Sequence, residues 1–237
     1  RPALLIVMTA SRELECSLAQ RWGVVAGMDE VGRGALAGPV AVGVALVGAD
    51  APAVPGGLTD SKALSPRRRE ALVEPIHSWV LASCVAYASA AEIDRWGIVC
   101  ALRLAGRRAL AGVVAKGHAP GGVLLDGSHD WLSISDDLCA ADGPDYPDCG
   151  ALPVHTQVKA DASCAVVAAA SVLAKVARDR LMREAEDPGY GWASNKGYGS
   201  AAHARAIARL GVSDFHRRTW RMPQVRTNEG TPGWRGA

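Results

Sequence analysis

The chain lacks the cysteine patterns that mark a zinc site or a redox motif. Its 237 residues include six cysteines with no C-x-x-C pair. These are Cys16, Cys84, Cys100, Cys139, Cys149 and Cys164. Three of them lie in apolar stretches, where buried thiols are common. This usage favours a reducing compartment, and we expect Cys139 and Cys149, which could close a short loop, to be free thiols.

Long apolar runs and a strong charge of one sign are missing as well. The stretch from Pro2 to Met8 is too short to span a membrane and is not followed by the cleavage site of a secretory signal. The 26 basic side chains nearly balance the 24 acidic ones, so the net charge of +2 says little about partners. We therefore expect a cytoplasmic protein without membrane contact.

Internal repeats and linkers are absent too, so a single main domain is expected. The composition, 49% hydrophobic and 21% charged, is ordinary for a globular protein. We assign residues 1–23 to an N-terminal extension, 24–224 to the domain and 225–237 to a flexible tail. Local arginine clusters are interpreted either as a phosphate-facing surface or as solvated helix faces. They comprise Arg67, Arg68, Arg69, Arg107, Arg108, Arg217, Arg218 and Arg221.

Apolar patterning predicts an α/β fold with a central mixed β-sheet flanked by helices. Strands are expected over residues 24–28, 40–47, 79–87, 123–125 and 152–158. Helices are expected over residues 65–77, 98–114, 162–182 and 200–210. Ser65, Ser89 and Ser200 have the positions of helix caps. The polar segment 128–150, rich in Asp, Gly and Pro, is predicted to be a surface excursion and not core.

Four carboxylates stand at the edges of apolar elements: Asp29, Glu30, Asp126 and Asp161. A carboxylate in such a place is costly unless it is paired or binds a metal. Without accompanying His or Cys, these oxygen ligands suit Mg²⁺ or Mn²⁺ better than zinc, and two ions could activate a water and stabilise the leaving oxygen of a phosphodiester. Taken singly, each acid is also consistent with a surface carboxylate or a helix cap, Asp161 in particular.

A glycine-rich turn, Gly32-Arg33-Gly34, follows the acidic pair. It superficially matches a dinucleotide-binding loop, but that loop is followed by a helix, whereas Pro39 and a β-type run follow here. Glycines allow backbone amides to approach a sugar or phosphate closely, and Arg33 adds a positive charge.

These residues form motifs. The segment 28–34, with Gly38 and Pro39 behind it, resembles the signature of the ribonuclease HII family. Further blocks agree with the family in order over residues 24–223. They are residues 59–62 with 64–65, 125–127, 159–161 before 168–179, 196–199, and 216–218. Departures are the long excursion 128–150, Ala160 and the Thr219-Trp220 pair.

The resemblance implies a ribonuclease H-like fold with a catalytic, metal-binding quartet of Asp29, Glu30, Asp126 and Asp161. It also implies substrate-binding residues beside the quartet. The Gly32-Arg33-Gly34 loop would contact the 2′-hydroxyl that distinguishes RNA from DNA. Tyr198 would pack on the sugar after the ribonucleotide and sense the RNA–DNA junction, and Lys62 would contact a phosphate.

The activity that the resemblance implies is that of an endoribonuclease, dependent on Mg²⁺ or Mn²⁺. It would cut the RNA strand of RNA–DNA hybrids and the 5′ side of ribonucleotides embedded in duplex DNA, leaving a 3′-hydroxyl and a 5′-phosphate. This cut is the opening step of ribonucleotide excision repair.

Two other classes of protein function could share these features. A non-catalytic nucleic-acid-binding module would normally lack one of the four acids, and a nucleotide-cofactor enzyme is disfavoured by Pro39. The acids of the excursion would repel a phosphate backbone, so we expect it to lie away from the nucleic acid.

Overall fold

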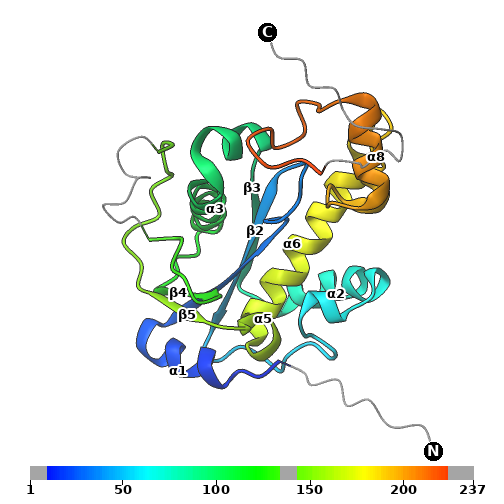
Figure 1. Cartoon of the computed structure of the whole chain (residues 1–237). Helices are drawn as coiled ribbons and strands as arrows, with labels where there is room; N and C mark the ends of the chain where they lie inside the picture. Colours follow the sequence, from blue (N-terminus) through cyan, green and yellow to red (C-terminus); the bar gives the residue numbers. More distant parts are fainter. Residues whose placement is uncertain (1–9, 134–142, 224–237) are drawn as a thin grey trace, which may run out of the picture.

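A mixed β-sheet forms the centre of the computed structural model, which describes residues 10–133 and 143–223 (Figure 1). Within that part of the chain the sheet has five strands in the order β3-β2-β1-β4-β5. The strands are β1 (Val24–Val31), β2 (Val40–Gly48), β3 (Ala82–Ala88), β4 (Gly122–Asp126) and β5 (Val154–Gln157). The pairs β1–β2 and β2–β3 are antiparallel, whereas β1–β4 and β4–β5 are parallel. The predicted mixed sheet is confirmed.

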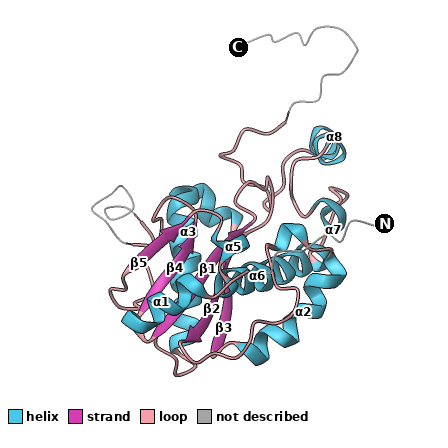
Figure 2. Ribbon diagram, turned by 90° about the horizontal axis from the view of Figure 1, so that it is seen from below, coloured by secondary structure: helices cyan, strands magenta, loops and turns pink. Residues whose placement is uncertain are grey.

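Helices cover both faces of the sheet (Figure 2). The helices of the described residues are α1 (Glu13–Trp22), α2 (Pro66–Trp79), α3 (Ala90–Val114), α5 (Ala160–Ser163), α6 (Ala165–Glu184), α7 (Trp192–Asn195) and α8 (Ala201–Leu210), with a 3₁₀ turn η1 at Ser61–Ala63. Helix α8 lies away from the sheet. Alternate residues of the strands point to opposite faces. Val25 and Val47 pack against α1, α2 and α6, whereas Met28 and Val44 pack against α3.

The predicted serine caps mark true helix starts, whereas the apolar pattern placed the start of α3 at residue 98 and the helix begins at Ala90. The hydroxyls of Ser65, Ser89 and Ser200 each accept a backbone N–H of the following turn. Several boundaries differ from expectation. Strand β1 continues through the acidic pair to Val31, so these acids lie within the strand. The helix predicted over 162–182 is two helices, because Cys164 has an extended backbone.

Part of the polar excursion belongs to the core, contrary to the prediction. Trp131 and Leu132 are buried against α3, where they pack close to Gly106. Arg103 of α3 is 1% exposed, and its Nε–H donates to the carbonyl oxygen of Trp131 at 3.2 Å. One aromatic and one aliphatic side chain, Trp131 and Leu132, therefore anchor the first part of this polar segment in the core.

The segment assigned to an N-terminal extension also packs on the domain. Helix α1 places the Glu15 carboxylate where it accepts the Val166 N–H of α6 at 2.7 Å and pairs with Arg12 at 3.0 Å. Burial raises the pKa of Glu15, while these partners oppose the shift. This carboxylate thus satisfies an N-terminal amide of the helix that crosses the sheet.

Four cysteines, Cys16, Cys84, Cys149 and Cys164, are free thiols, as expected for Cys149. Cys100 is disulfide-bonded, which the expectation of a reducing compartment did not anticipate. Cys139 lies outside the described residues. No helix in the ranges 10–133 and 143–223 is both long and apolar enough to cross a membrane.

Candidate active site

Strand pairing brings three of the four predicted acids to one edge of the sheet. Asp29 and Glu30 lie on β1, and Asp126 is the last residue of β4. Met28 is paired with Leu125 in the parallel β1–β4 ladder, so Asp29 and Asp126 follow at the same level. The carboxyl ends of parallel strands are where open α/β sheets place their ligand sites.

The fourth acid, Asp161, lies on the short helix α5, and the carboxylate of Asp126 caps this helix. One oxygen of Asp126 accepts the N–H groups of Ala160, at 2.7 Å, and of Asp161, at 3.4 Å. Lys159, which precedes them, occupies the N-cap position of α5 in a left-handed conformation. Asp161 therefore lies in the first turn of α5 and is not its N-cap, which removes that alternative.

The acids share one electrostatic environment. Asp29 is 5% exposed, and burial, reinforced by Glu30, Asp126 and Asp161, raises its pKa to about 8, against a hydrogen bond from Ser171. Burial likewise raises the pKa of Glu30 and of Asp161, with Asp126 adding to both shifts. At neutral pH the carboxyl of Asp29 is thus held largely protonated, a state that a bound cation would reverse.

Two exposed cations accompany the acids. The Lys62 Nζ lies 3.7 Å from Asp161 and the side chain is 79% exposed. Partial burial alone would lower the pKa of Lys62, but the carboxylates of Asp161 and Asp29 outweigh it, so the pKa of Lys62 is raised. Arg33, 55% exposed, lies 3.5 Å from Glu30. Neither cation is buried among the acids, so both remain able to meet an incoming anion.

The acids fit a hard divalent cation by donor chemistry and not by a preformed cage. Among the described residues, no group of three or more His, Cys, Asp or Glu side chains is arranged to hold a metal ion. The donors are all carboxylate oxygens, the ligands preferred by Mg²⁺ and Mn²⁺. Burial is the main cause of the raised pKa of Asp29, and the negative charges of Glu30, Asp126 and Asp161 add to it; a bound cation would offset both contributions.

Buried arginines support the glycine-rich loop from below. A side chain at Gly32, whose φ is +88°, would lie 2.1 Å from the Nε of Arg178, so only glycine fits there. Arg217 is fully buried and donates to the carbonyl oxygens of Gly32 at 2.6 Å, Arg33 at 2.7 Å and Gly38 at 3.2 Å. The loop's carbonyls are thus occupied from inside the protein, which leaves its outer side free.

Tyr198 lies on a neighbouring loop. The N–H groups of Leu36 and Ala37 donate to the carbonyl oxygen of Gly197 at 2.8 and 3.1 Å, which joins the Tyr198 loop to the glycine-rich loop. The Tyr198 ring lies 5.4 Å from the guanidinium carbon of Arg178 and 5.9 Å from the Lys175 Nζ. Cations against the ring fix its plane.

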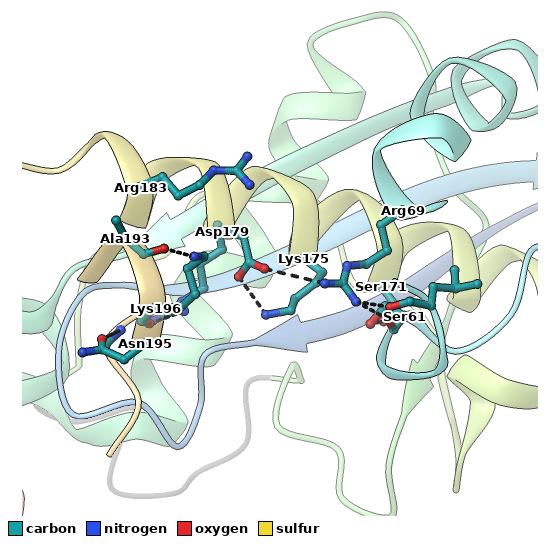
Figure 3. Close-up of polar contacts among 12 residues, drawn as sticks. Ser61, Arg69, Ser171, Lys175, Asp179, Arg183, Ala193, Asn195 and Lys196 are labelled. Atoms are coloured by element: carbon teal, nitrogen blue, oxygen red, sulfur yellow. Dashed lines mark hydrogen bonds and ion pairs between the residues drawn. The ribbon is translucent and has the colours of Figure 1, made fainter. Parts of the chain in front are cut away.

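A polar strip runs along α6 from Ser171 through Lys175 to Asp179, toward the segment that precedes Tyr198 (Figure 3). The Ser171 and Ser61 hydroxyls are hydrogen-bonded at 2.9 Å, and Ser171 also bonds to Asp29. One turn on, the Lys175 Nζ donates to Asp179 at 2.7 Å. The buried Arg69 donates to the carbonyl oxygen of Ser61 at 2.7 Å and lies 3.9 Å from Asp179. The strip shows that α6 carries polar groups toward the site at four-residue spacing.

A family model described as Ribonuclease HII matches residues 26–222. The chain belongs to the ribonuclease HII family. The ribonuclease HII of Streptomyces avermitilis is 40% identical over 232 residues, which cover 95% of this chain and 90% of the relative. The family membership makes the chain a ribonuclease H, an endonuclease of the hydrolase class.

Solved structures agree with the ribonuclease H-like fold of this ribonuclease HII family member. Ribonuclease H2 from Pyrococcus horikoshii is 25% identical with a TM-score of 0.53, covering 84% of this chain and 94% of the other. Bst-RNase HIII in complex with Mn²⁺ is 23% identical with a TM-score of 0.57, covering 81% of this chain and 63% of the other. The second likeness supports the fold alone.

Sequence reasoning missed the residues that hold the ribonuclease HII loops. Arg69 and Arg217, interpreted from the sequence as part of either a phosphate-facing surface or a solvated helix face, are buried and donate to backbone carbonyls. Arg178 and Ser171 stood inside a motif without an assigned role. For Ser171 the available signal was its place in a series with Lys175 and Asp179, one polar residue every fourth position, in a helix whose first half is apolar.

Proposed function

We propose that this chain cuts the RNA strand of RNA–DNA hybrids and the 5′ side of ribonucleotides embedded in duplex DNA, leaving a 3′-hydroxyl and a 5′-phosphate. The observation that carries the proposal is a cluster of four carboxylates, three at one end of the sheet and Asp161 on α5, close enough for three of them to raise the pKa of Asp29. The cluster lies directly before a loop in which Arg33 and Gly34 are exposed. A phosphodiester brings negative charge to negative charge, so such a site requires cations.

In this proposal Asp29, Glu30, Asp126 and Asp161 hold Mg²⁺ or Mn²⁺, in a two-ion site. When bound, these ions supply water activation and neutralise charge on the leaving oxygen. The related ribonuclease HIII was crystallised with Mn²⁺. Burial shields the carboxyl of Asp29 from water, and a hydrogen bond from Ser171 orients it. The Asp126 carboxylate caps α5 and thereby holds Asp161 beside the end of the sheet.

The chain's own residues also divide the substrate contacts. The loop Gly32-Arg33-Gly34 meets the ribose 2′-hydroxyl, the group that separates RNA from DNA. Lys62, exposed beside Asp161, meets a phosphate. Tyr198 packs on the sugar that follows the ribonucleotide. This substrate class assigns the enzyme to ribonucleotide excision repair in the cytoplasm.

The deciding experiment is incubation of the protein with duplex DNA containing one labelled ribonucleotide, with Mg²⁺, with Mn²⁺, and with chelator. We expect one cut on the 5′ side of the ribonucleotide, dependent on the metal, with a 3′ end that a DNA polymerase extends. An all-DNA duplex is the control. Cleavage of the all-DNA duplex, or a cut that persists in chelator, would contradict the proposal.

A further inference from the structure

Arg178 of α6 is a fully buried cation that lies between the two substrate-facing loops. Its Nε donates to the carbonyl oxygen of Pro39 at 2.8 Å, and one terminal nitrogen donates to Ala37 at 3.3 Å. The other terminal nitrogen donates to the carbonyl oxygen of Lys196 at 3.0 Å. One guanidinium therefore binds the end of the glycine-rich loop and the start of the Tyr198 loop together.

The packing around Arg178 leaves little freedom to either loop. A side chain at Gly32 would collide with its Nε, and a side chain at Gly197 would lie 2.2 Å from the carbonyl oxygen of Ala37. The Tyr198 ring lies over the guanidinium at 5.4 Å. The arginine thus touches the first glycine of one loop and the aromatic ring of the other.

Arginine is suited to this position because its guanidinium is planar and carries five donors in a rigid fork. A lysine would keep the charge but has one nitrogen, which cannot reach three carbonyl groups in two loops at fixed angles. Within the part of the chain that the structure describes, Arg178 donates to loop carbonyls and not to the four acids, which are held by β1, β4 and α5. Its loss should therefore leave the acids in place.

We propose that Arg178 is a positioning residue that sets the distance between the 2′-hydroxyl-reading loop and Tyr198, so that the ribonucleotide and the sugar after it are recognised together. This inference rests on the proposed function. It makes Arg178 a determinant of preference for a lone ribonucleotide. In a uniform RNA strand no RNA-to-DNA step follows the cut, so the spacing to Tyr198 contributes less there.

The test is the Arg178→Lys variant, measured as kcat/KM on a single-ribonucleotide duplex and on a uniform RNA–DNA hybrid. Misplacement of a substrate-positioning group by about 1 Å costs up to about a hundredfold in rate. We expect the ratio of the two kcat/KM values to fall by about tenfold or more. The matched control is Arg180→Lys on the same helix, whose side chain is 71% exposed and pairs with Glu184.

Two further variants separate positioning from a purely structural role. In the Tyr198→Ala background, Arg178→Lys should change the ratio by less than about twofold, because the contact through which it acts is already gone. Gly197→Ala, which pushes the same two loops apart, should lower the ratio without touching the arginine, and it serves if Arg178→Lys fails to fold by circular dichroism.

The positioning role would be overturned if Arg178→Lys lowers both kcat/KM values equally, or if neither Arg178→Lys nor Gly197→Ala changes their ratio. In either case the activity of the parent protein would leave the proposed function intact. A parent protein that cuts neither substrate with Mg²⁺ or Mn²⁺ would overturn both proposals. The two failures are therefore distinguishable.

Discussion

The four acids and the two substrate-binding loops of the proposed site are held in place by different kinds of contact. We call the first group, Asp29, Glu30, Asp126 and Asp161, the acidic edge. We call the second group, the glycine-rich loop and the Tyr198 loop with Arg178 and Arg217, the loop cluster. At the acidic edge, β1, β4 and α5 set the side chains through regular backbone pairing and one capping carboxylate. In the loop cluster, side chains bind backbone carbonyls: Arg178 and Arg217 hold the glycine-rich loop. The proposed metal site therefore rests on regular secondary structure, and the proposed substrate recognition rests on long-range polar contacts.

A histidine pair extends the loop cluster. The Ser213 N–H donates to His216 Nδ1 at 3.1 Å, so the other ring nitrogen of His216 carries the proton. That nitrogen lies 3.1 Å from His203 Nε2, and His203 Nδ1 in turn lies 3.0 Å from the carbonyl oxygen of Tyr198. Both rings are therefore neutral and donate in sequence toward the Tyr198 loop.

The comparison predicts that damage to the acidic edge has the largest effect. Asp29→Asn or Asp126→Asn should lower kcat by about 10²- to 10³-fold, the range seen when one group that stabilises transition-state charge is lost. Substrate binding should largely survive. Single-turnover cleavage and a gel-shift titration measure the two effects, with the exposed Asp50→Asn as control. A near-parental rate in saturating Mg²⁺ would show that the quartet is assigned wrongly.

Damage to the loop cluster should reduce cleavage less and more selectively. Tyr198→Ala should slow cleavage at a lone ribonucleotide by about 10- to 100-fold, because positioning is lost while the acids remain. Tyr198→Phe, which keeps the ring, should retain most of the rate. Both are measured by single-turnover cleavage of the same duplex, and parental rates for Tyr198→Ala would remove the proposed contact.

The histidine pair gives the loop cluster a pH dependence of stability. Burial, with His203 adding to it, lowers the pKa of His216 from 6.5 to about 4. Below pH 6.5 the imidazole of His216 binds a proton in the unfolded chain but not in the folded one, which favours unfolding. The contribution of His216 to the free energy of unfolding is therefore present above pH 6.5 and is lost progressively as pH falls toward 4.

The raised pKa of Asp29 acts in the opposite direction, so the measurement must be a difference. The Tm of the parent minus the Tm of His216→Gln, followed by circular dichroism, should shrink as pH falls from about 7 to about 4.5. His118→Gln, a half-buried histidine outside the pair, is the control. A Tm difference that is constant with pH would mean that His216 does not titrate as proposed.

The smallest effect is expected in the excursion. Cys149 is a free, half-buried thiol that lines a pocket with Arg107 and Leu110 of α3, and burial raises its pKa. Cys149→Ser should leave cleavage and its salt dependence within about twofold of the parent. A large loss of activity with an unchanged circular dichroism spectrum would place this segment in the active site.

The sequence by itself determined the parts that depend on neighbouring residues. Ser65, Ser89 and Ser200 predicted helix starts because a cap and the amide it satisfies lie within one turn. The apolar runs predicted the mixed sheet, and the motifs predicted the family. The four acids could be named because each stands where an apolar element meets polar residues.

Only the tertiary structure decided which polar groups are buried and what they bind. Arg103, Arg178 and Arg217 have the same local signal as solvated arginines, since the long apolar stem and the charged fork suit a surface as well as a buried carbonyl cluster. Their partners, such as Gly32 for Arg217, are far away in the chain. Periodicity records neighbours along one element, so contacts between distant loops appear only when the sheet and helices have brought those loops together.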